Sequence, residues 1–110
     1  QPYYPEISVV IPVFNEEDSL DALQDKLISS LDSLGRSWEV IFVDDGSRDS
    51  SFQKLEQMAA RERRFKVVRF VRNFGQTAGL SAGIDNASGN VIIPMDADLQ
   101  NDPVDIKRGD

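Results

Sequence analysis

Four short apolar runs, each followed by a polar loop, constrain the fold more than any other feature of this sequence. The runs are rich in Val, Ile and Phe, which favours β-strands, and they cover residues 7–12, 38–43, 65–71 and 91–95. Between them lie three segments with a helical pattern or composition, at 20–34, 52–59 and 78–87. Strands and helices that alternate in this way form βαβ units. The chain is therefore predicted to be a Rossmann-like α/β domain with a mostly parallel sheet and helices on both faces.

The loops after the four runs are expected to gather at one edge of the sheet. Right-handed crossovers bring the carboxyl ends of parallel strands together, and open α/β sheets bind ligands beyond those ends. The loops that we expect there cover residues 12–17, 44–49, 72–77 and 96–100. They hold many acids and few bases, so a diphosphate ligand would be repelled unless a cation accompanied it. This charge balance favours a metal-dependent site for a nucleotide diphosphate.

The last apolar run ends in two carboxylates, Asp96 and Asp98, with Ala97 between them. We expect this run to be a buried strand that delivers both acids into a loop. Alternate residues of an extended chain point the same way, so the two carboxylates can face one object. Hard divalent ions such as Mg²⁺ or Mn²⁺ prefer oxygen ligands of this kind. The alternative interpretation is an ordinary Asp-rich turn after a strand.

The other three loops allow both a ligand-binding and a purely structural interpretation. A carboxylate at Asp44 can accept hydrogen bonds from ribose or base, with backbone donors at Gly46 and Ser47, but the same loop also fits a capped turn. Residues 72–73 are candidates for a phosphate or nucleotide edge, or for a simple strand-to-helix bridge. Neither of the glycine-rich phosphate-binding motifs of dinucleotide sites and P-loops occurs in the sequence. Three glycines near the third helix are better explained by close packing of helix on sheet, at Gly75, Gly79 and Gly83.

The composition narrows the class of protein further. A length of 110 residues allows at most one ordinary domain, and a net charge of −7 argues against nucleic acid or an anionic membrane surface as a partner. The absence of cysteine and histidine excludes disulfides, thiolate metal sites and Ser-His or Cys-His nucleophiles. No apolar run approaches the roughly 20 residues that span a bilayer, so the chain itself is expected to be soluble.

Four motifs together make the sequence similar to a known family. They are VIPVFNE at 10–16, VDDGS at 43–47, RNFGQ at 72–76 with LSAG at 80–83, and MDADLQ at 95–100. In order and spacing they resemble the family 2 glycosyltransferases with the GT-A fold. The resemblance is strongest to the branch that uses polyprenyl phosphates, which includes dolichol-phosphate mannose synthases and bacterial undecaprenyl-phosphate sugar transferases.

The resemblance implies an inverting transfer of a sugar from a UDP- or GDP-sugar to a polyprenyl phosphate, assisted by Mg²⁺ or Mn²⁺. The nucleotide-sugar contacts carried over by motif are Pro12, Phe14 and Glu16 around the base, Asp44 at base or ribose, Gly46, Ser47, Asn73 and Gln76, with Asp96 near the ribose. The implied metal ligands are Asp96, Asp98 and Gln100, with Asp98 also stabilising the leaving group. Phe14 stands where the family often has tyrosine, so stacking on a base survives without the hydroxyl. No general base is assigned.

Members of the family continue well past the last motif, so the chain is expected to be the nucleotide-sugar-binding part of a GT-A domain, either truncated or with a segment missing after about residue 106. The parent protein is expected at the cytoplasmic face of a membrane. By itself the chain is expected to bind donor with little transfer, and its last strand is a possible edge for homo-oligomers. The alternatives are a non-catalytic nucleotide-binding fragment and a metal-dependent phosphatase that uses the Asp-x-Asp pair.

Overall fold

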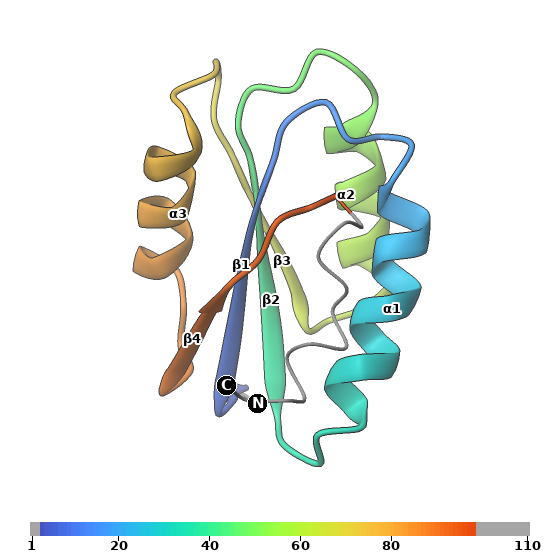
Figure 1. Ribbon diagram of the computed structural model, residues 1–110, viewed down its shortest axis with the longest axis vertical. Coiled ribbons are helices and arrows are strands. Elements are labelled where there is room, and N and C mark those ends of the chain that lie inside the picture. Colours follow the sequence, from blue (N-terminus) through green and yellow to red (C-terminus); the bar gives the residue numbers. More distant parts are fainter. Residues whose placement is uncertain (1–2, 99–110) are drawn as a thin grey trace.

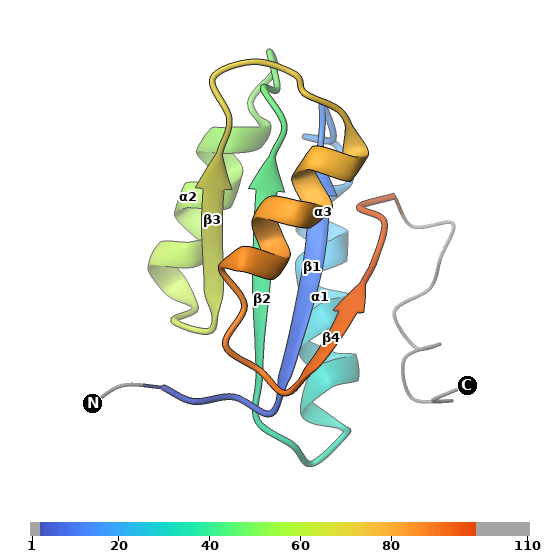
Figure 2. The same ribbon diagram turned by 90° about the vertical axis from the view of Figure 1, so that its left-hand side faces the viewer.

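The computed structural model describes residues 3–98 and shows a four-stranded parallel sheet with helices on both faces (Figures 1 and 2). The sheet order is β3-β2-β1-β4, which places β1 between β2 and β4. The elements in chain order are β1 (Ile7–Val13), α1 (Leu20–Asp32), β2 (Trp38–Asp44), α2 (Ser51–Arg61), β3 (Phe65–Arg69), α3 (Gln76–Asp85) and β4 (Val91–Pro94). The predicted fold class is confirmed.

The two faces of the sheet are covered differently. Helices α1 and α2 pack on one face, and α3 packs alone on the other (Figure 1). Because successive residues of a strand point to opposite faces, Val9 and Ile11 of β1 enter the core under α1 and α2, where Leu23 and Leu55 meet them. None of the helices within residues 3–98 has the length and apolar character needed to cross a bilayer.

Helix α3 approaches the sheet closely because it carries glycine at two contact positions. A Cβ at Gly79 would lie 3.2 Å from the Cβ of Pro12, and a Cβ at Gly83 would overlap Val10. The prediction that these glycines serve helix-on-sheet packing is therefore confirmed for Gly79 and Gly83. It is wrong for Gly75, which precedes α3 with a φ of +101° and has open space around its Cα, so its role is to allow a turn.

The element boundaries differ from the predicted ones where polar contacts decide them. Strand β3 ends at Arg69, two residues early, and α3 begins at Gln76 rather than at residue 78.

Strand β4 was expected to be buried, but Val91 and Ile92 are 46% and 39% exposed. Within residues 3–98, β4 pairs with β1 alone and forms an edge of the sheet, so no element shields its outer side.

The basic segment at residues 61–64 does not extend into solvent as a tail. Its residue Arg64 anchors it to the neighbouring elements. The Arg64 guanidinium lies 4.0 Å from the ring centre of Trp38 and forms ion pairs with Asp32 at 2.9 Å and with Glu62 at 2.7 Å. Hydrogen bonds from Arg64, opposed by burial, hold the pKa of Glu62 below its ordinary value. The turn from α2 into β3 is thereby fastened to the start of β2.

A buried carboxylate at the amino end of β2 ties β4 to the rest of the sheet. Glu39 is fully buried and accepts hydrogen bonds from the Ser8 hydroxyl at 2.6 Å and from the Ser88 amide at 2.7 Å. The Lys66 ammonium lies 2.7 Å from its other oxygen. The Gly89 amide in turn donates to the Ser8 hydroxyl oxygen. These contacts fix the loop between α3 and β4 against β1 and β2.

This network predicts a pH-dependent contribution to stability. Burial alone would raise the pKa of Glu39, but the hydrogen bonds from Lys66, Ser8 and Ser88 outweigh it and leave the pKa below its ordinary value of 4.5. A lowered pKa in the folded state means that the folded protein binds fewer protons than the unfolded one. The contribution is therefore present above about pH 4.5 and is lost as the pH falls through the folded-state pKa.

We expect Glu39→Gln to lower the free energy of unfolding at pH 7 by about 2–4 kcal/mol, because it leaves buried donors poorly matched. Urea denaturation at pH 7 and at pH 3 measures the loss, which should shrink at the lower pH. Glu56→Gln, an exposed change on α2, is the matched control. A loss of equal size at both pH values, or an equal loss in the control, would contradict this account.

Candidate functional site

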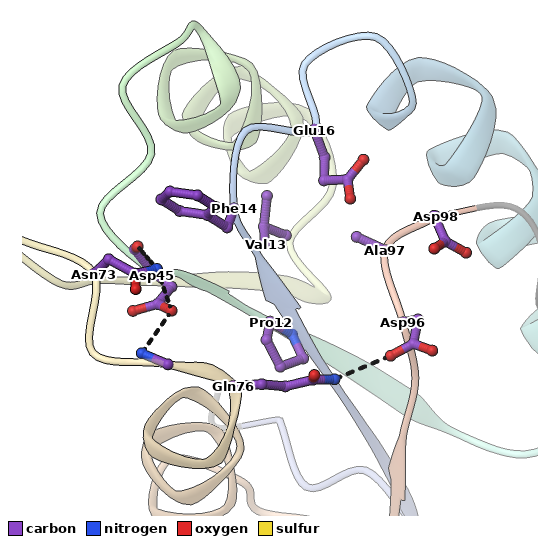
Figure 3. Close-up of a pocket in the computed structure, with 11 residues that line it drawn as sticks. Pro12, Val13, Phe14, Glu16, Asp45, Asn73, Gln76, Asp96, Ala97 and Asp98 are labelled. Atoms are coloured by element: carbon purple, nitrogen blue, oxygen red, sulfur yellow. Dashed lines mark hydrogen bonds between the residues drawn. The ribbon is translucent and has the colours of Figure 1, made fainter.

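A cleft of about 420 Å³ lies at the carboxyl edge of the sheet, where all four loops meet (Figure 3). It is lined by Pro12, Val13, Phe14, Glu16, Asp45, Asn73, Gly75, Gln76, Asp96, Ala97 and Asp98. Seven of the predicted site residues therefore share one cavity. Phe14 and Asn73 stand toward one end, and Asp98 stands at the other (Figure 3).

The first loop is held by the second, which fixes Phe14 and Glu16 at the cleft. The Asn15 amide donates to the Ser47 hydroxyl oxygen at 2.9 Å, and the Arg48 amide donates to the Asn15 side-chain oxygen at 2.8 Å. Asn15 adopts a φ of +53°, a left-handed conformation that asparagine tolerates well. The Glu16 amide donates to the hydroxyl oxygen of the buried Ser51. The first two loops thus form one unit.

Asp45 organises the third loop. Its carboxylate accepts hydrogen bonds from the Asn73 side chain at 2.9 Å, the Phe74 amide at 2.7 Å and the Gly75 amide at 3.0 Å. Gly46 follows with a φ of +72°, and any Cβ there would overlap the backbone of residues 72–73. Only glycine lets the second loop approach the third this closely.

The structure places Asp44 outside the cleft wall. Its side chain is fully buried, and neither carboxylate oxygen has a hydrogen-bond partner among residues 3–98. Asp44 is the last residue of β2 and shares a face with Phe42 of the core, so its side chain points below the loops. The neighbouring Asp45, which the sequence analysis did not select, lines the cleft instead. Side chains alternate between the two faces of a strand, so counting from the core residue Phe42 would have distinguished Asp44 from Asp45 in the sequence.

Two further predicted residues lie beside the cleft, and one is outside the described part of the chain. Gly46 and Ser47 line a neighbouring hollow that shares Phe14 and Asn73 with the cleft. Gln100 lies outside residues 3–98. Sequence reasoning also missed Val13, Gly75 and Ala97 as lining residues, because apolar and small residues carry no chemical signature.

The acidic end of the cleft is formed by the loop after β4. Ala97 is buried, and its methyl group points toward Val13 and Glu16 (Figure 3). The flanking carboxylates are partly buried, and the Gln76 side-chain amide donates to Asp96 at 3.1 Å. Asp98 lies on the side of Ala97 that is opposite Val13 (Figure 3). The first turn of α3 is thereby connected to the Asp-x-Asp loop across the cleft.

The oxygens at this end suit Mg²⁺ or Mn²⁺ bound together with a phosphate ligand. Within residues 3–98, no group of three or more acidic, histidine or cysteine side chains is arranged to hold a metal by itself. Magnesium sites of phosphate-transferring enzymes commonly use one or two carboxylates and complete the shell with water and substrate phosphates. Asp96 and Asp98 fit that donor set, whereas a closed protein cage is not formed here.

Comparison with known proteins gives a consistent result. The family model described as glycosyl transferase family 2 matches residues 8–108. The dodecaprenyl-phosphate galacturonate synthase of Rhizobium johnstonii is 46% identical over 102 residues, which is 92% of this chain and 30% of that protein. The undecaprenyl-phosphate 4-deoxy-4-formamido-L-arabinose transferase of Edwardsiella ictaluri is 45% identical over 103 residues, or 93% and 32%. The chain thus spans about a third of the length of these relatives.

Solved structures share the fold. S. aureus TarS residues 1–349 superpose with a TM-score of 0.72 at 24% identity, covering 94% of this chain and 31% of that one. A mannosyltransferase from Pyrobaculum calidifontis, solved with GDP-Man and Mn²⁺, gives a TM-score of 0.68 at 22% identity, covering 87% and 28%. Because the family model spans nearly the whole chain and agrees with the fold, this chain belongs to glycosyl transferase family 2.

Proposed function

We propose that this chain is the donor-binding part of an inverting, metal-dependent glycosyltransferase that moves a sugar from a UDP- or GDP-sugar to a polyprenyl phosphate. The observation that carries the proposal is the cleft itself. An exposed aromatic ring at Phe14 stands toward one end, and two carboxylates stand at the other, within a cavity of about 420 Å³. A nucleoside diphosphate has the same order of groups, with a flat base at one end and anionic phosphates at the other.

The base end offers stacking and hydrogen-bond acceptors. Phe14 is 44% exposed and can stack on a base, while Glu16 lies near it with acceptor oxygens for base or ribose (Figure 3). Asp45 is held by Asn73 and two backbone amides, so its main role is to keep the wall in place. Asp44 is buried beneath this end of the cleft, so it can affect a bound base only indirectly and not by direct contact.

At the acidic end, Asp96 and Asp98 are the residues that would hold Mg²⁺ or Mn²⁺. When bound, such a cation neutralises the diphosphate leaving group as a Lewis acid. Gln76 orients Asp96 through its hydrogen bond and so fixes the loop that carries both acids. Without a cation, these carboxylates repel a diphosphate, because like charges about 4 Å apart interact by roughly 4 kcal/mol at an effective dielectric constant of 20.

The proposed acceptor is suggested by the names of the relatives and by simple chemistry. Both curated relatives described above are named for transfer to polyprenyl phosphates. A phosphate acceptor is already anionic at neutral pH, so it needs a strong general base less than a hydroxyl acceptor does. Inversion requires attack on the anomeric carbon from the side opposite the diphosphate. Residues 3–98 supply groups for the donor, and we assign none to the acceptor.

We expect UDP or GDP to bind this chain with Mn²⁺ present and to bind at least roughly tenfold more weakly in excess chelator, because carboxylates repel a diphosphate when no divalent cation lies between them. Calorimetric titration of each nucleotide in both conditions measures the difference. Uridine and guanosine, which lack phosphate, are the control ligands and should show no metal effect. Equal affinity for a nucleotide in both conditions would contradict the metal dependence.

The substitution Asp98→Asn should reduce the Mn²⁺-dependent gain in affinity by at least roughly tenfold, since even outer-shell partners of bound metals matter that much. Asp25→Asn on the exposed side of α1 removes the same charge from a residue that does not line the cleft and should leave the gain unchanged. Asp45→Asn should weaken binding with and without metal, because it loosens the third loop. If Asp98→Asn and Asp45→Asn lose the metal-dependent gain equally, the metal site is misassigned.

A further inference from the structure

A second hollow of about 370 Å³ lies beside the cleft, on the other side of Phe14 and Asn73. It is formed by the ends of the first, second and third loops, and the loop from β3 to α3 is the arch at the top of Figure 2. Three of its lining residues are arginines, Arg48, Arg69 and Arg72, and none is acidic. In a chain with a net charge of −7, this is a pronounced local excess of positive charge.

Two of the three arginines are oriented by aromatic rings. The Arg69 guanidinium lies 4.1 Å from the ring centre of Phe52, and that of Arg72 lies 4.8 Å from the ring centre of Phe74. None of the three arginines forms a salt bridge within the part of the chain that the structure describes. Stacking on an aromatic face orients a guanidinium and leaves its N–H donors available to an anion.

Asp45 and Asp49 of the second loop are already engaged by N–H donors, whereas the buried carboxylate of Asp44, the register partner of Arg69, has no hydrogen-bond partner among residues 3–98. Asp45 accepts from the third loop, and Asp49 accepts from the amides of Glu17 at 3.3 Å and Ser51 at 2.9 Å. Burial opposes the ionisation of Asp49, but these hydrogen bonds prevail and hold its pKa below the ordinary value. The same contacts lock the three loops together, so the arginines stand on a fixed frame and not on independent loops.

The rim of the hollow is apolar. Val71 and Phe14, which line it, are 93% and 44% exposed, and Phe74, which packs on Phe70 of the lining, is 51% exposed. A soluble phosphate group gains nothing from an exposed aliphatic side chain such as Val71, although Phe14 can also stack on a nucleotide base. An anionic lipid surface satisfies both features at once, because its headgroups pair with arginines and its interfacial region accepts apolar side chains.

We propose that Arg48, Arg69 and Arg72 bind the phosphate headgroup of an anionic lipid, with Val71 and Phe74 inserted beside it at the membrane surface. This interaction surface lies outside the donor cleft and goes beyond the proposed function. Its biological relevance rests on that function, because the proposed acceptor, a polyprenyl phosphate, is itself a lipid. The net charge of −7, which argued against an anionic membrane surface as a partner, is a sum over the whole chain. Charges more than about 8–10 Å away are largely screened at physiological salt, so the local patch decides the contact.

Vesicle co-sedimentation of the 110-residue chain, in chelator and without nucleotide, tests the proposal. We expect binding to phosphatidylcholine vesicles that contain about 30% phosphatidylglycerol, and little binding to phosphatidylcholine alone. The double variant Arg48→Gln/Arg72→Gln should lower the partition coefficient by roughly 30-fold, the effect of removing two arginines from an anionic surface. Val71→Ser should lower it without changing any charge.

The matched control is Arg36→Gln/Arg61→Gln, which removes two exposed arginines near the opposite edge of the sheet and should bind like the parent chain. Thermal unfolding of each variant confirms that it is folded. Equal binding of the parent and the Arg48/Arg72 variant overturns the proposal, as does an equal loss in the control. So does the result that glycerol phosphate binds and vesicles do not. Because no metal or nucleotide is present, none of these outcomes depends on the donor cleft.

Discussion

The parallel pairing of β1 with both of its neighbours is the constraint on which the rest of the structure depends. Val13 of β1 pairs with Asp44 of β2, so these two strands end together. Strand β4 ends before them, and the loop that follows it continues beside the cleft. The Glu39 network fixes this arrangement at the amino ends of the strands, and Asp45 fixes the loops at the carboxyl ends. Both are buried carboxylates whose oxygens are occupied by N–H or O–H donors, which makes the sheet edge a rigid frame for binding.

Charge is divided between two hollows that share Phe14 and Asn73. The larger cleft carries acids toward one end, where under the proposed function a divalent cation would convert repulsion of a diphosphate into attraction. The smaller hollow carries arginines and needs no cation to attract an anion. A net charge of −7 describes neither site, because at physiological salt each ligand responds to the charges within about a Debye length. The donor and a lipid surface can therefore be attracted by neighbouring parts of an acidic chain.

Much of this arrangement was predictable from the sequence. The alternation of apolar runs and helical segments predicted the fold class, strand-end chemistry predicted where the loops gather, and the family resemblance named seven of the residues that line the cleft. The choice of Asp44 over Asp45 ignored strand alternation, which turns Asp44 toward the core face of Phe42. The sequence left β4 open between a buried strand and an exposed edge, because an apolar run does not reveal whether a strand has one neighbour or two; within residues 3–98 it has one. The anchoring of Arg64 on Trp38 depends on a long-range contact that local pattern cannot encode.

The central claim is that a divalent cation binds at the Asp-x-Asp end of the cleft, together with the diphosphate. Paramagnetic broadening by Mn²⁺ in the amide NMR spectrum of the isotopically labelled chain, recorded with UDP or GDP present, tests it most directly. The account predicts that broadening is strongest for residues 95–98 and extends to Gln76, while Glu39 and Ser88 at the opposite edge keep sharp signals. Broadening centred on another part of the sheet, or none at all with nucleotide bound, would contradict it.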